Sequence, residues 1–278
     1  MADMQRIQEL WHSADFDYRA GSPHLKHWAL HERLVSTTKV ALADVIRRNL
    51  PRTVLEIGAG HGGFTEPILA SGFLMTATEM SRSSLAELET RFGLNPGFRG
   101  VFDPDGSLNA LGTERFAVVF YASVLHHIPD YMSAIRSAIA EHLLQGGALV
   151  SIQDPLWYPA LRWKDSFASN ASYFAWRLGQ GNYVRGAKTR VRRALGVLSE
   201  DEPADMTEYH VVRNGVNQTE ILDFLQGVFE SVQIIPYWST QSALFQRAGE
   251  LLGFRSTFAI VAVGLRTGPN TARAGTEL

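Results

Sequence analysis

The chain has 278 residues, of which 45% are hydrophobic and 19% are charged, and its net charge is −2 at pH 7. This composition supplies a large core and excludes a disordered chain, and the small net charge argues against a general nucleic-acid or membrane-surface binder. The absence of cysteine excludes disulfides, thiolate metal sites and cysteine nucleophiles. We find no signal-peptide pattern and no run of about 18 apolar residues, so we expect a cytoplasmic protein without a membrane span.

Residues 1–20 predict a short amphipathic helix, because Ile7, Leu10 and Trp11 fall on one face. Such a helix lies outside the expected core. We expect it to cover the binding site as a lid or to pack on a neighbouring subunit, with ordinary packing onto the domain as the alternative. Tyr18 lies near its end and is a candidate catalytic residue.

A longer helix is predicted from about residue 24 to residue 49, with a kink near Ser36. Its apolar stripe comprises Leu34, Val40, Leu42 and Ile46. Three histidines, His24, His27 and His31, recur on one face of this helix. No carboxylate accompanies them, so a partly exposed face is favoured over a metal site, and we expect no metal.

The stretch from Thr53 to Thr65, TVLEIGAGHGGFT, organises the chain. A short apolar strand runs into a cluster of glycines, and a helical pattern begins near Phe64. Glycine allows positive φ and lets the backbone approach a ligand closely, and the helix N-terminus behind the turn presents unpaired N–H groups. The pattern predicts the nucleotide-binding corner of an open α/β sheet.

A second strand, residues 73–79, ends in Glu79, seventeen residues after Gly62, near the spacing of about 20 for a ribose-binding carboxylate. A helix over residues 81–92 follows, with Ser81 as its candidate N-cap. Residues 100–103 predict the third strand. Its last residue, Asp103, is also a candidate turn residue in the sequence Asp-Pro-Asp-Gly.

The fourth strand is expected at residues 116–121, a helix at 131–144 and a fifth strand at 148–153. Two histidines, His126 and His127, follow the fourth strand, and Asp154 follows the fifth. Ligands of open α/β sheets lie beyond the carboxyl ends of the strands. Asp154 is therefore expected to face the substrate or the transferred methyl group.

Residues 156–214 are long for a connection and rich in aromatic side chains, which predicts a helical insertion that caps the substrate. The candidate substrate contacts are Trp157, Tyr158, Asn170 and His210, of which His210 is also a second candidate base. Residues 185–193 contain a run of basic side chains, and we interpret it as a solvated surface in preference to a binding site for an anionic substrate.

The last elements are an amphipathic helix at residues 218–229 and two closing strands at 231–237 and 258–265. The helix has Asn217 or Thr219 as its cap. The two strands are expected to pair antiparallel across a long connection. Residues 268–278 are polar, and we expect a disordered tail.

Four ordered motifs resemble those of the class I S-adenosylmethionine (SAM) methyltransferases. They are Glu56-x-Gly58-x-Gly60-x-Gly62, the acid-ended strand 73–79, the segment 122–130 (ASVLHHIPD) and the segment 146–152 (GGALVSI). The resemblance implies a Rossmann-like α/β sheet with SAM as cofactor, with the core at residues 21–155 and 215–267. The N-terminal helix and the helical cap insertion are additions to that core.

The resemblance also implies the cofactor contacts. The residues are Glu56, Gly58, Ala59, Gly60, Gly62, Glu79, Met80, Phe102, Asp103, Ala122 and Ser123. It implies that Glu79 accepts the ribose hydroxyls, that Phe102 and Asp103 flank the adenine, and that the glycine turn meets the methionine portion. The expected partners are a small-molecule acceptor and a second copy of the chain through the N-terminal helix, without nucleic acid or membrane.

The acceptor chemistry has two readings. A proton-bearing acceptor needs a base, and His126 or His127 can serve; a structural histidine that binds backbone is the alternative. The chain also resembles natural-product methyltransferases of actinobacteria, including the methyltransferase-cyclases of teleocidin-type alkaloids. That likeness implies C-methylation of a prenylated indole alkene with cyclisation, and the aromatic faces of Trp157, Tyr158 and Trp163 can stabilise the cation. A non-methylating SAM protein and a partner subunit are the alternatives from other classes.

Overall fold

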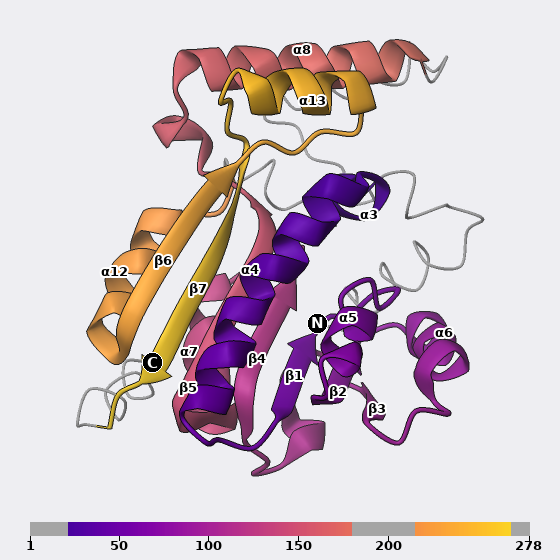
Figure 1. Ribbon diagram of the computed structural model, residues 1–278, viewed down its shortest axis with the longest axis vertical. Coiled ribbons are helices and arrows are strands. Elements are labelled where there is room, and N and C mark those ends of the chain that lie inside the picture. Colours follow the sequence, from indigo (N-terminus) through magenta and orange to yellow (C-terminus); the bar gives the residue numbers. More distant parts are fainter. Residues whose placement is uncertain (1–21, 180–214, 268–278) are drawn as a thin grey trace.

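The computed structural model describes residues 22–179 and 215–267, and within them one mixed sheet runs in the order β3-β2-β1-β4-β5-β7-β6 (Figure 1). The strands are β1 (Thr53–Ile57), β2 (Leu74–Glu79), β3 (Phe98–Phe102), β4 (Phe116–Ala122), β5 (Leu143–Pro155), β6 (Phe229–Tyr237) and β7 (Thr257–Leu265). The first five pair in parallel, and β7 runs antiparallel to both of its neighbours. This is the predicted α/β fold.

Helices connect and cover these strands. They are α3 (Pro23–Lys26), α4 (Trp28–Arg47), α5 (Thr65–Ala70), α6 (Arg82–Phe92), α7 (Tyr131–His142), α8 (Trp163–Gly179), α12 (Gln218–Val228) and α13 (Ala243–Leu251), with short 3₁₀ turns η1 (Asn109–Leu111), η2 (Leu125–His127) and η3 (Tyr158–Ala160). None of the helices within the described ranges is both long enough and apolar enough to cross a bilayer.

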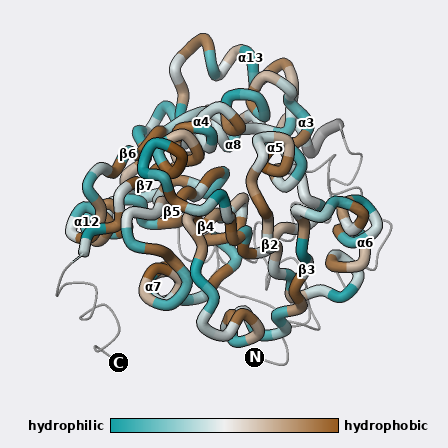
Figure 2. Tube along the Cα trace, turned by 60° about the horizontal axis from the view of Figure 1, so that its bottom comes forward, coloured by the Kyte–Doolittle hydropathy of each residue, from teal (hydrophilic) through white to brown (hydrophobic). Residues whose placement is uncertain are grey.

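Successive side chains of each strand point to opposite faces of the sheet, and they contribute to two hydrophobic cores, one on each face. Val54 of β1 packs with α4 and with Phe64 and Ile68, whereas its neighbour Leu55 packs with α7 and α12. The inner strands are largely buried on both faces, as strands between two layers of helices usually are, whereas the edge strands β3 and β6 are only partly buried. Figure 2 shows these largely hydrophobic strands between the helices.

Side-chain caps start three of the helices where the sequence supplies a suitable residue. Ser81 accepts from the Ser84 N–H at 3.3 Å, and Asn217 accepts from the Glu220 N–H at 3.3 Å. Asp130 does the same for α7, accepting from the Ser133 N–H at 3.0 Å. Each cap satisfies one of the N–H groups that a helix start leaves unpaired. The predicted caps Ser81 and Asn217 are thereby confirmed.

The break in the first long helix lies at His27, and the prediction of a kink near Ser36 was wrong. His27 has extended backbone angles (φ −96°, ψ 101°), and its Nε2 lies 2.7 Å from the Thr240 carbonyl oxygen. The side chains of Val40 and Ile46 are exposed rather than part of the buried stripe. Leu34, Leu42 and Val45 face the core, because the phase of the helix is set by packing on the sheet.

Several element boundaries also differ from the predictions. Strand β5 begins at Leu143, five residues early, because Leu143 pairs with Phe116 ahead of a bulge. Helix α7 therefore ends at His142 instead of Leu144. Strand β3 starts at Phe98, and Phe229 opens β6 rather than closing α12.

The described part of the expected cap is fixed to the connection between β6 and β7. Asp165 of α8 is buried and accepts from Arg162 and from the Arg255 N–H at 3.2 Å. Farther along α8, Ser172 accepts a hydrogen bond from Thr240 at 3.1 Å. Helices α8 and α13 consequently lie together at one end of the molecule (Figure 1). Residues 1–21, 180–214 and 268–278, including the predicted lid helix and tail, lie outside the described residues.

Two helical glycines provide a matched test of this packing. A Cβ at Gly249 of α13 would overlap the indole ring of Trp238, whereas a Cβ at Gly227 of α12 would meet nothing within 4 Å. Gly249→Ala should therefore lower the free energy of unfolding by about 1–3 kcal/mol. Gly227→Ala should raise it by up to about 1 kcal/mol through helix propensity. Urea unfolding of both variants checks the pair, and equal stability would contradict the packing of α13 on Trp238.

Candidate cofactor and acceptor site

The glycine turn after β1 adopts the conformation that its sequence predicts. Gly58, Gly60 and Gly62 have φ values of 68°, 56° and 70°. A Cβ at Gly58 would press on Val124 at 3.0 Å, so this turn touches the segment after β4. A Cβ at Gly60 would meet no protein atom within 4 Å. The Gly60 side of the turn therefore leaves room for a ligand, at the point where the strand order reverses between β1 and β4.

Glu79 ends β2 beside this turn. Its carboxylate is buried, and Oε1 accepts a hydrogen bond from the Gly60 N–H. Burial raises the pKa of Glu79 to about 7, against the lowering effect of backbone hydrogen bonds from Gly60, Ser81 and Met80. The predicted ribose acid thus lies against the predicted glycine turn.

Glu56, inside the motif, is buried beneath the turn. Its Oε2 accepts from the Thr65 hydroxyl at 2.6 Å, and its Oε1 has no hydrogen-bond partner among the described residues. Burial raises the pKa of Glu56 to about 8; the Thr65 hydrogen bond lowers it and the charge of Glu79 raises it further. A buried carboxylate oxygen without a donor indicates a place for an additional donor, such as an ammonium group or a water.

Phe102 ends β3, where it pairs with Glu79, and Asp103 follows it. The Asp103 N–H donates to the Glu79 carbonyl oxygen at 2.8 Å, and both Asp103 carboxylate oxygens accept from the Leu108 N–H at 3.2 and 3.3 Å. Burial raises the pKa of Asp103. Phe102 stacks under the Arg82 guanidinium at 3.9 Å. Asp103 therefore does fix its own turn, and its position beside Glu79 is also compatible with the predicted adenine contact.

His126 lies in η2, after β4, against the end of β5. Asp154 Oδ1 accepts from the His126 backbone N–H at 3.1 Å and lies 2.8 Å from His126 Nδ1. Asp154 Oδ2 accepts from the Ser151 hydroxyl at 2.7 Å. The His127 ring lies 4.0 Å from the His126 ring, centroid to centroid.

The expectation that Asp154 faces the substrate needs correction. Asp154 is fully buried, and both carboxylate oxygens are engaged by His126 and Ser151. It therefore holds a histidine instead of presenting an oxygen to an acceptor. Ala122 and Ser123 lie where the motif predicted, at the end of β4, and Ser123 has φ 62°, which is rare for a residue with a side chain.

The segment before α4 packs on the glycine turn. A Cβ at Gly63 would overlap the Leu25 side chain of α3. His24 is buried and stacks on Phe64 at 6.0 Å, and its Nδ1 has no hydrogen-bond partner among the described residues. Burial, together with the nearby His31 and His126, lowers the pKa of His24 to about 3. The sequence suggested a partly exposed histidine face, and for His24 this was wrong.

The candidate acceptor residues are only partly brought together. Trp157 is half-buried and donates its backbone N–H to Gln218 at 3.0 Å, whereas Tyr158 is 39% exposed. Asn170 is exposed on α8 and donates to its own helix at 2.9 Å. Tyr18 and His210 lie outside the described residues. No cluster of three or more potential metal ligands occurs within residues 22–179 and 215–267.

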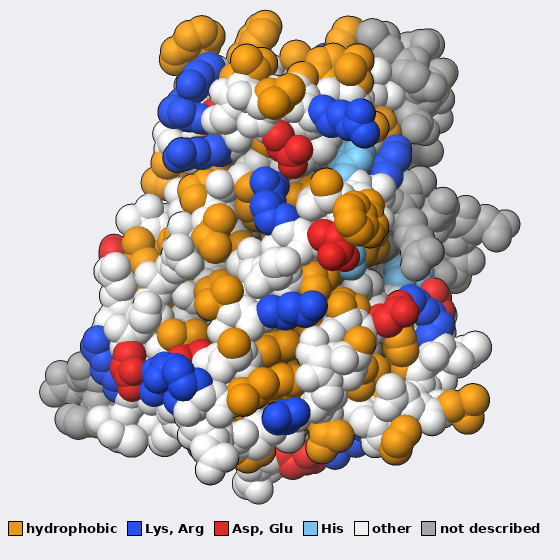
Figure 3. Space-filling model, viewed as in Figure 1, with side chains coloured by type: hydrophobic (Ala, Val, Ile, Leu, Met, Phe, Trp, Pro, Cys, Tyr) orange, Lys and Arg blue, Asp and Glu red, His pale blue; other side chains and the backbone are white. Residues whose placement is uncertain are grey.

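The aromatic side chains of α8 point largely to the surface. Trp163, Phe167 and Phe174 are 82%, 70% and 55% exposed. Figure 3 shows hydrophobic side chains gathered at the top of the view, where α8 and α13 lie. These three rings therefore do not form a closed aromatic wall in the described residues.

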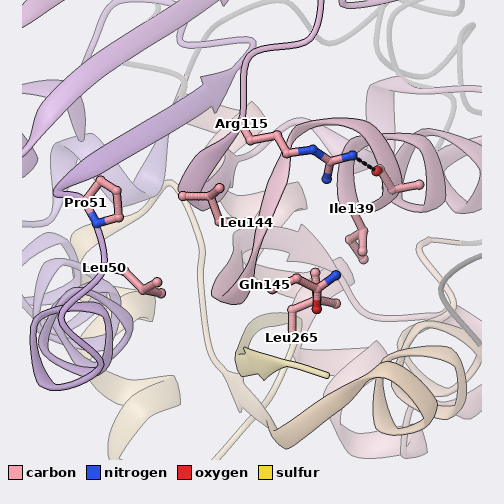
Figure 4. A pocket seen from close by; sticks show the side chains of 8 residues that line it. Leu50, Pro51, Arg115, Ile139, Leu144, Gln145 and Leu265 are labelled. Carbon is pink, nitrogen blue, oxygen red and sulfur yellow. Dashed lines mark hydrogen bonds between the residues drawn. The ribbon is translucent and has the colours of Figure 1, made fainter. Parts of the chain in front are cut away.

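A pocket of about 610 Å³ lies at the opposite end of the sheet (Figure 4). It is lined by Leu50, Pro51, Arg115, Ile139, Ala140, Leu144, Gln145 and Leu265. Arg115 donates to the Ala140 and Leu143 carbonyl oxygens at 2.7 and 2.9 Å. The pocket borders the amino-terminal ends of β1, β4 and β5, away from the carboxyl ends where open α/β sheets bind ligands, so it is not the candidate site.

Sequence reasoning missed three residues of the site. Thr65 binds Glu56, and Gln153 and Tyr237 bind one another beside Asp154. Thr65 was recognisable in principle, since it lies nine residues after Glu56 in the same strand-turn-helix unit. Tyr237 carried no signal, because it lies 84 residues from its partner.

The two buried glutamates predict how stability depends on pH. Their folded pKa values, about 8 for Glu56 and about 7 for Glu79, lie above the ordinary value of 4.5. The folded chain then binds more protons than the unfolded chain, and this contribution to stability falls as the pH rises from about 4.5 to 8. Glu56→Gln should remove much of this pH dependence. At about pH 8 the free energy of unfolding of the variant should exceed that of the wild type by on the order of 3 kcal/mol.

Urea unfolding of the ligand-free chain between about pH 5 and pH 8 checks this. Glu89→Gln, at an exposed position of α6, is the control and should keep the wild-type pH dependence. A Glu56→Gln variant with an unchanged pH dependence would show that Glu56 is not a high-pKa carboxyl group.

We compared the chain with known protein families, with curated proteins and with solved structures. Residues 55–149 match a family model described as a methyltransferase domain. An 80-residue stretch is 38% identical to the ribosomal RNA small subunit methyltransferase A of Synechococcus sp., covering 29% of this chain and 28% of that protein. The glycopeptide N-methyltransferase MtfA, solved with S-adenosyl-L-homocysteine, is 30% identical over 37% of this chain and 45% of its own, with a TM-score of 0.33.

The overall fold has a fuller match. The N-methyltransferase NodS from Bradyrhizobium japonicum WM9, solved with S-adenosyl-L-homocysteine, aligns over 95% of this chain and 99% of its own, at 14% identity and a TM-score of 0.53. The chain spans under a third of the curated relative and under half of MtfA, so their substrates are stated of them alone. The predicted α/β fold is confirmed: the chain has the fold of the N-methyltransferase NodS over nearly its whole length, and the stretch that contains the glycine turn matches the methyltransferase-domain model.

Proposed function

We propose that the chain binds SAM at the carboxyl ends of β1, β2 and β4 and transfers its methyl group to a small molecule bound at the carboxyl ends of β4 and β5. The observation that carries this proposal is the convergence of two buried carboxylates, Glu56 and Glu79, on a glycine turn whose Gly60 side is open. When bound, SAM supplies a methyl group activated by its sulfonium. The residues fit this cofactor, since a cation and two hydroxyls are the partners that buried carboxylates need.

The binding roles follow from position. Glu79 accepts from the ribose hydroxyls, and its neighbours Met80, Phe102 and Asp103 border the adenine. Glu56 faces the amino end of the methionine portion through Oε1, which has no hydrogen-bond partner in residues 22–179 and 215–267. The turn of Gly58, Ala59, Gly60 and Gly62 approaches that portion, with Ala122 and Ser123 on the β4 side.

Catalysis then rests on positioning and on exclusion of water. An in-line displacement needs the acceptor atom held against the methyl carbon, and holding reactants in this geometry supplies much of the rate. If the acceptor carries a proton, His126 is the favoured base because a carboxylate orients its ring. His127 is the second candidate. An alkene acceptor needs no base before attack, and a neighbouring aromatic face then stabilises the cation.

The acceptor class is a hydrophobic or aromatic small molecule of secondary metabolism. Two aromatic side chains that follow β5 support it, the half-buried Trp157 and the more exposed Tyr158. C-methylation of a prenylated indole with cyclisation is the specific form, and O- or N-methylation the alternative. A net charge of −2 disfavours an RNA acceptor. We further propose that residues 156–214 cap the acceptor, that residues 1–20 act as a lid or dimer contact, and that the protein is cytoplasmic.

Cofactor binding is the first test. Glu79→Ala should weaken the affinity for S-adenosyl-L-homocysteine by about 1–3 kcal/mol, because ligand hydroxyls lose a buried acceptor. Gly60→Val should abolish binding by filling the open side of the turn. Gly253→Val is the matched control, since Gly253 also has a positive φ (64°) and open space around it but lies next to α13. Titration calorimetry measures all three, and unchanged affinity in both site variants would remove the site assignment.

The acceptor chemistry is the second test. With a histidine base, His126→Ala should reduce the rate of methyl transfer by about 10²–10⁴, and the wild-type rate should fall at acidic pH, as reactions that need a general base do. With an alkene acceptor, the rate should be nearly flat with pH and should drop when Trp157 becomes Leu. Single-turnover assays on prenylated indoles and phenols, read by product mass, separate the two. A wild type that binds the cofactor but yields no methylated product from any acceptor would favour a non-methylating role.

A further inference from the structure

Strand β5 contains an unusual residue where it reaches the site. Gln153 has φ 67°, although it is not glycine, and it lies between Ile152 and Asp154, where the pairing with β7 shifts register. A bulge of this kind leaves one residue outside the ladder and bends the strand. Side-chain residues at positive φ persist only when their surroundings hold them, and they cluster at functional sites.

Tyr237, at the end of β6, holds this bulge from across β7. Its hydroxyl accepts from the Gln153 N–H at 2.9 Å and donates to Gln153 Oε1 at 3.0 Å. Gln153 Nε2 donates in turn to the Ser239 hydroxyl at 2.8 Å. Both Tyr237 and Gln153 are buried. The backbone N–H that the ladder leaves unpaired is thereby satisfied by a side chain, which secures the bulge.

The bulge determines where Asp154 points. In a regular strand, Ser151 and Asp154 would face opposite sides of the sheet, because side chains alternate. The extra residue brings them to the same side, where the Ser151 hydroxyl donates to Asp154 Oδ2 at 2.7 Å. The other carboxylate oxygen then meets the backbone N–H and Nδ1 of His126.

The contact with Asp154 also selects the tautomer of His126. An ionised carboxylate only accepts hydrogen bonds, so a neutral His126 must carry its proton on Nδ1, which leaves the lone pair on Nε2. A histidine of this tautomer can take a proton from an acceptor through Nε2, as a base oriented by a third group does.

We propose that Asp154 is the positioning residue of His126, and that the Tyr237–Gln153 pair holds Asp154 in that position. This inference rests on the proposed function in one respect only, the use of His126 Nε2 as a base toward the acceptor. The closing strands β6 and β7 thereby take part in the site, although neither contributes a residue to the glycine turn.

The tautomer of His126 is measured directly on the full chain labelled with ¹⁵N-histidine, by long-range ¹H–¹⁵N spectra at about pH 8, where an ordinary histidine is neutral. His126→Gln identifies the His126 signals. The wild type should show the Nδ1–H tautomer alone. Asp154→Asn should lose it in favour of Nε2–H, and Tyr237→Phe, which removes one hydroxyl, should give a mixture of the two.

Tyr121→Phe is the matched control. Tyr121 is also a fully buried tyrosine, but its hydroxyl has no hydrogen-bond partner among the described residues, so the His126 signals should stay as in the wild type. A wild-type His126 in the Nε2–H form, or a Tyr237→Phe spectrum identical to the wild type, would overturn the proposal. Should Asp154→Asn fail to fold, the conservative Tyr237→Phe variant still decides the result.

A calorimetric titration of the same samples with S-adenosyl-L-homocysteine keeps the two proposals apart. If the chain does not bind S-adenosyl-L-homocysteine but shows the Asp154-dependent tautomer, the proposed function is contradicted and this inference is supported. A chain that binds it with a His126 signal insensitive to both substitutions keeps the function and loses the inference.

Discussion

The structure depends on the burial of two carboxylates at one corner of a parallel sheet. Glu56 and Glu79 end up beneath and beside the glycine turn because β1 and β2 are in register and their carboxyl ends coincide. Removing two carboxyl groups from water is unfavourable. Hydrogen bonds from the Thr65 hydroxyl and the Gly60 N–H offset part of this penalty, and burial raises the pKa of both groups, which favours their neutral forms. Glu56 Oε1 still has no hydrogen-bond partner among the described residues, which supports the proposal that a ligand with a cationic end binds at this corner.

The acceptor side of the site is built by different means. Two residues with positive φ that are not glycine lie here: Ser123 directly follows β4, and Gln153 lies near the end of β5. The Ser123 N–H donates to the Ile152 carbonyl oxygen at 2.8 Å. Irregular backbone at two neighbouring strand ends redirects the chain so that η2 and Asp154 face one another. The glycine turn joins this assembly through the contact of Gly58 with Val124. The proposed cofactor and acceptor sides of the site are therefore packed against each other. The closing antiparallel strands support the proposed acceptor side through the hydrogen bonds of Tyr237 with Gln153.

The surroundings of the site are attached to this frame by a few buried polar contacts. Leu25 lies over Gly63, and His27 reaches Thr240, so α3 connects the glycine turn with the segment after β6. Asp165 ties α8 to the loop that follows α13. Helix α8, the first helix segment and the β6–β7 connection thus meet at one end of the molecule, above the carboxyl ends of the parallel strands (Figure 1).

The sequence by itself determined the frame: the strand-turn-helix unit at residues 53–70, the acid at the end of β2, the helix caps and the closing antiparallel strands. These features are encoded locally, by glycine conformation, capping side chains and side-chain periodicity, so a short window contains them. Only the tertiary structure decided the break at His27, the burial of Asp154 and the exposure of the α8 aromatics. The cause is clearest for His27 and Asp154, whose partners Thr240 and His126 lie 213 and 28 residues away. No local pattern specifies which distant side chain will satisfy such a hydrogen bond.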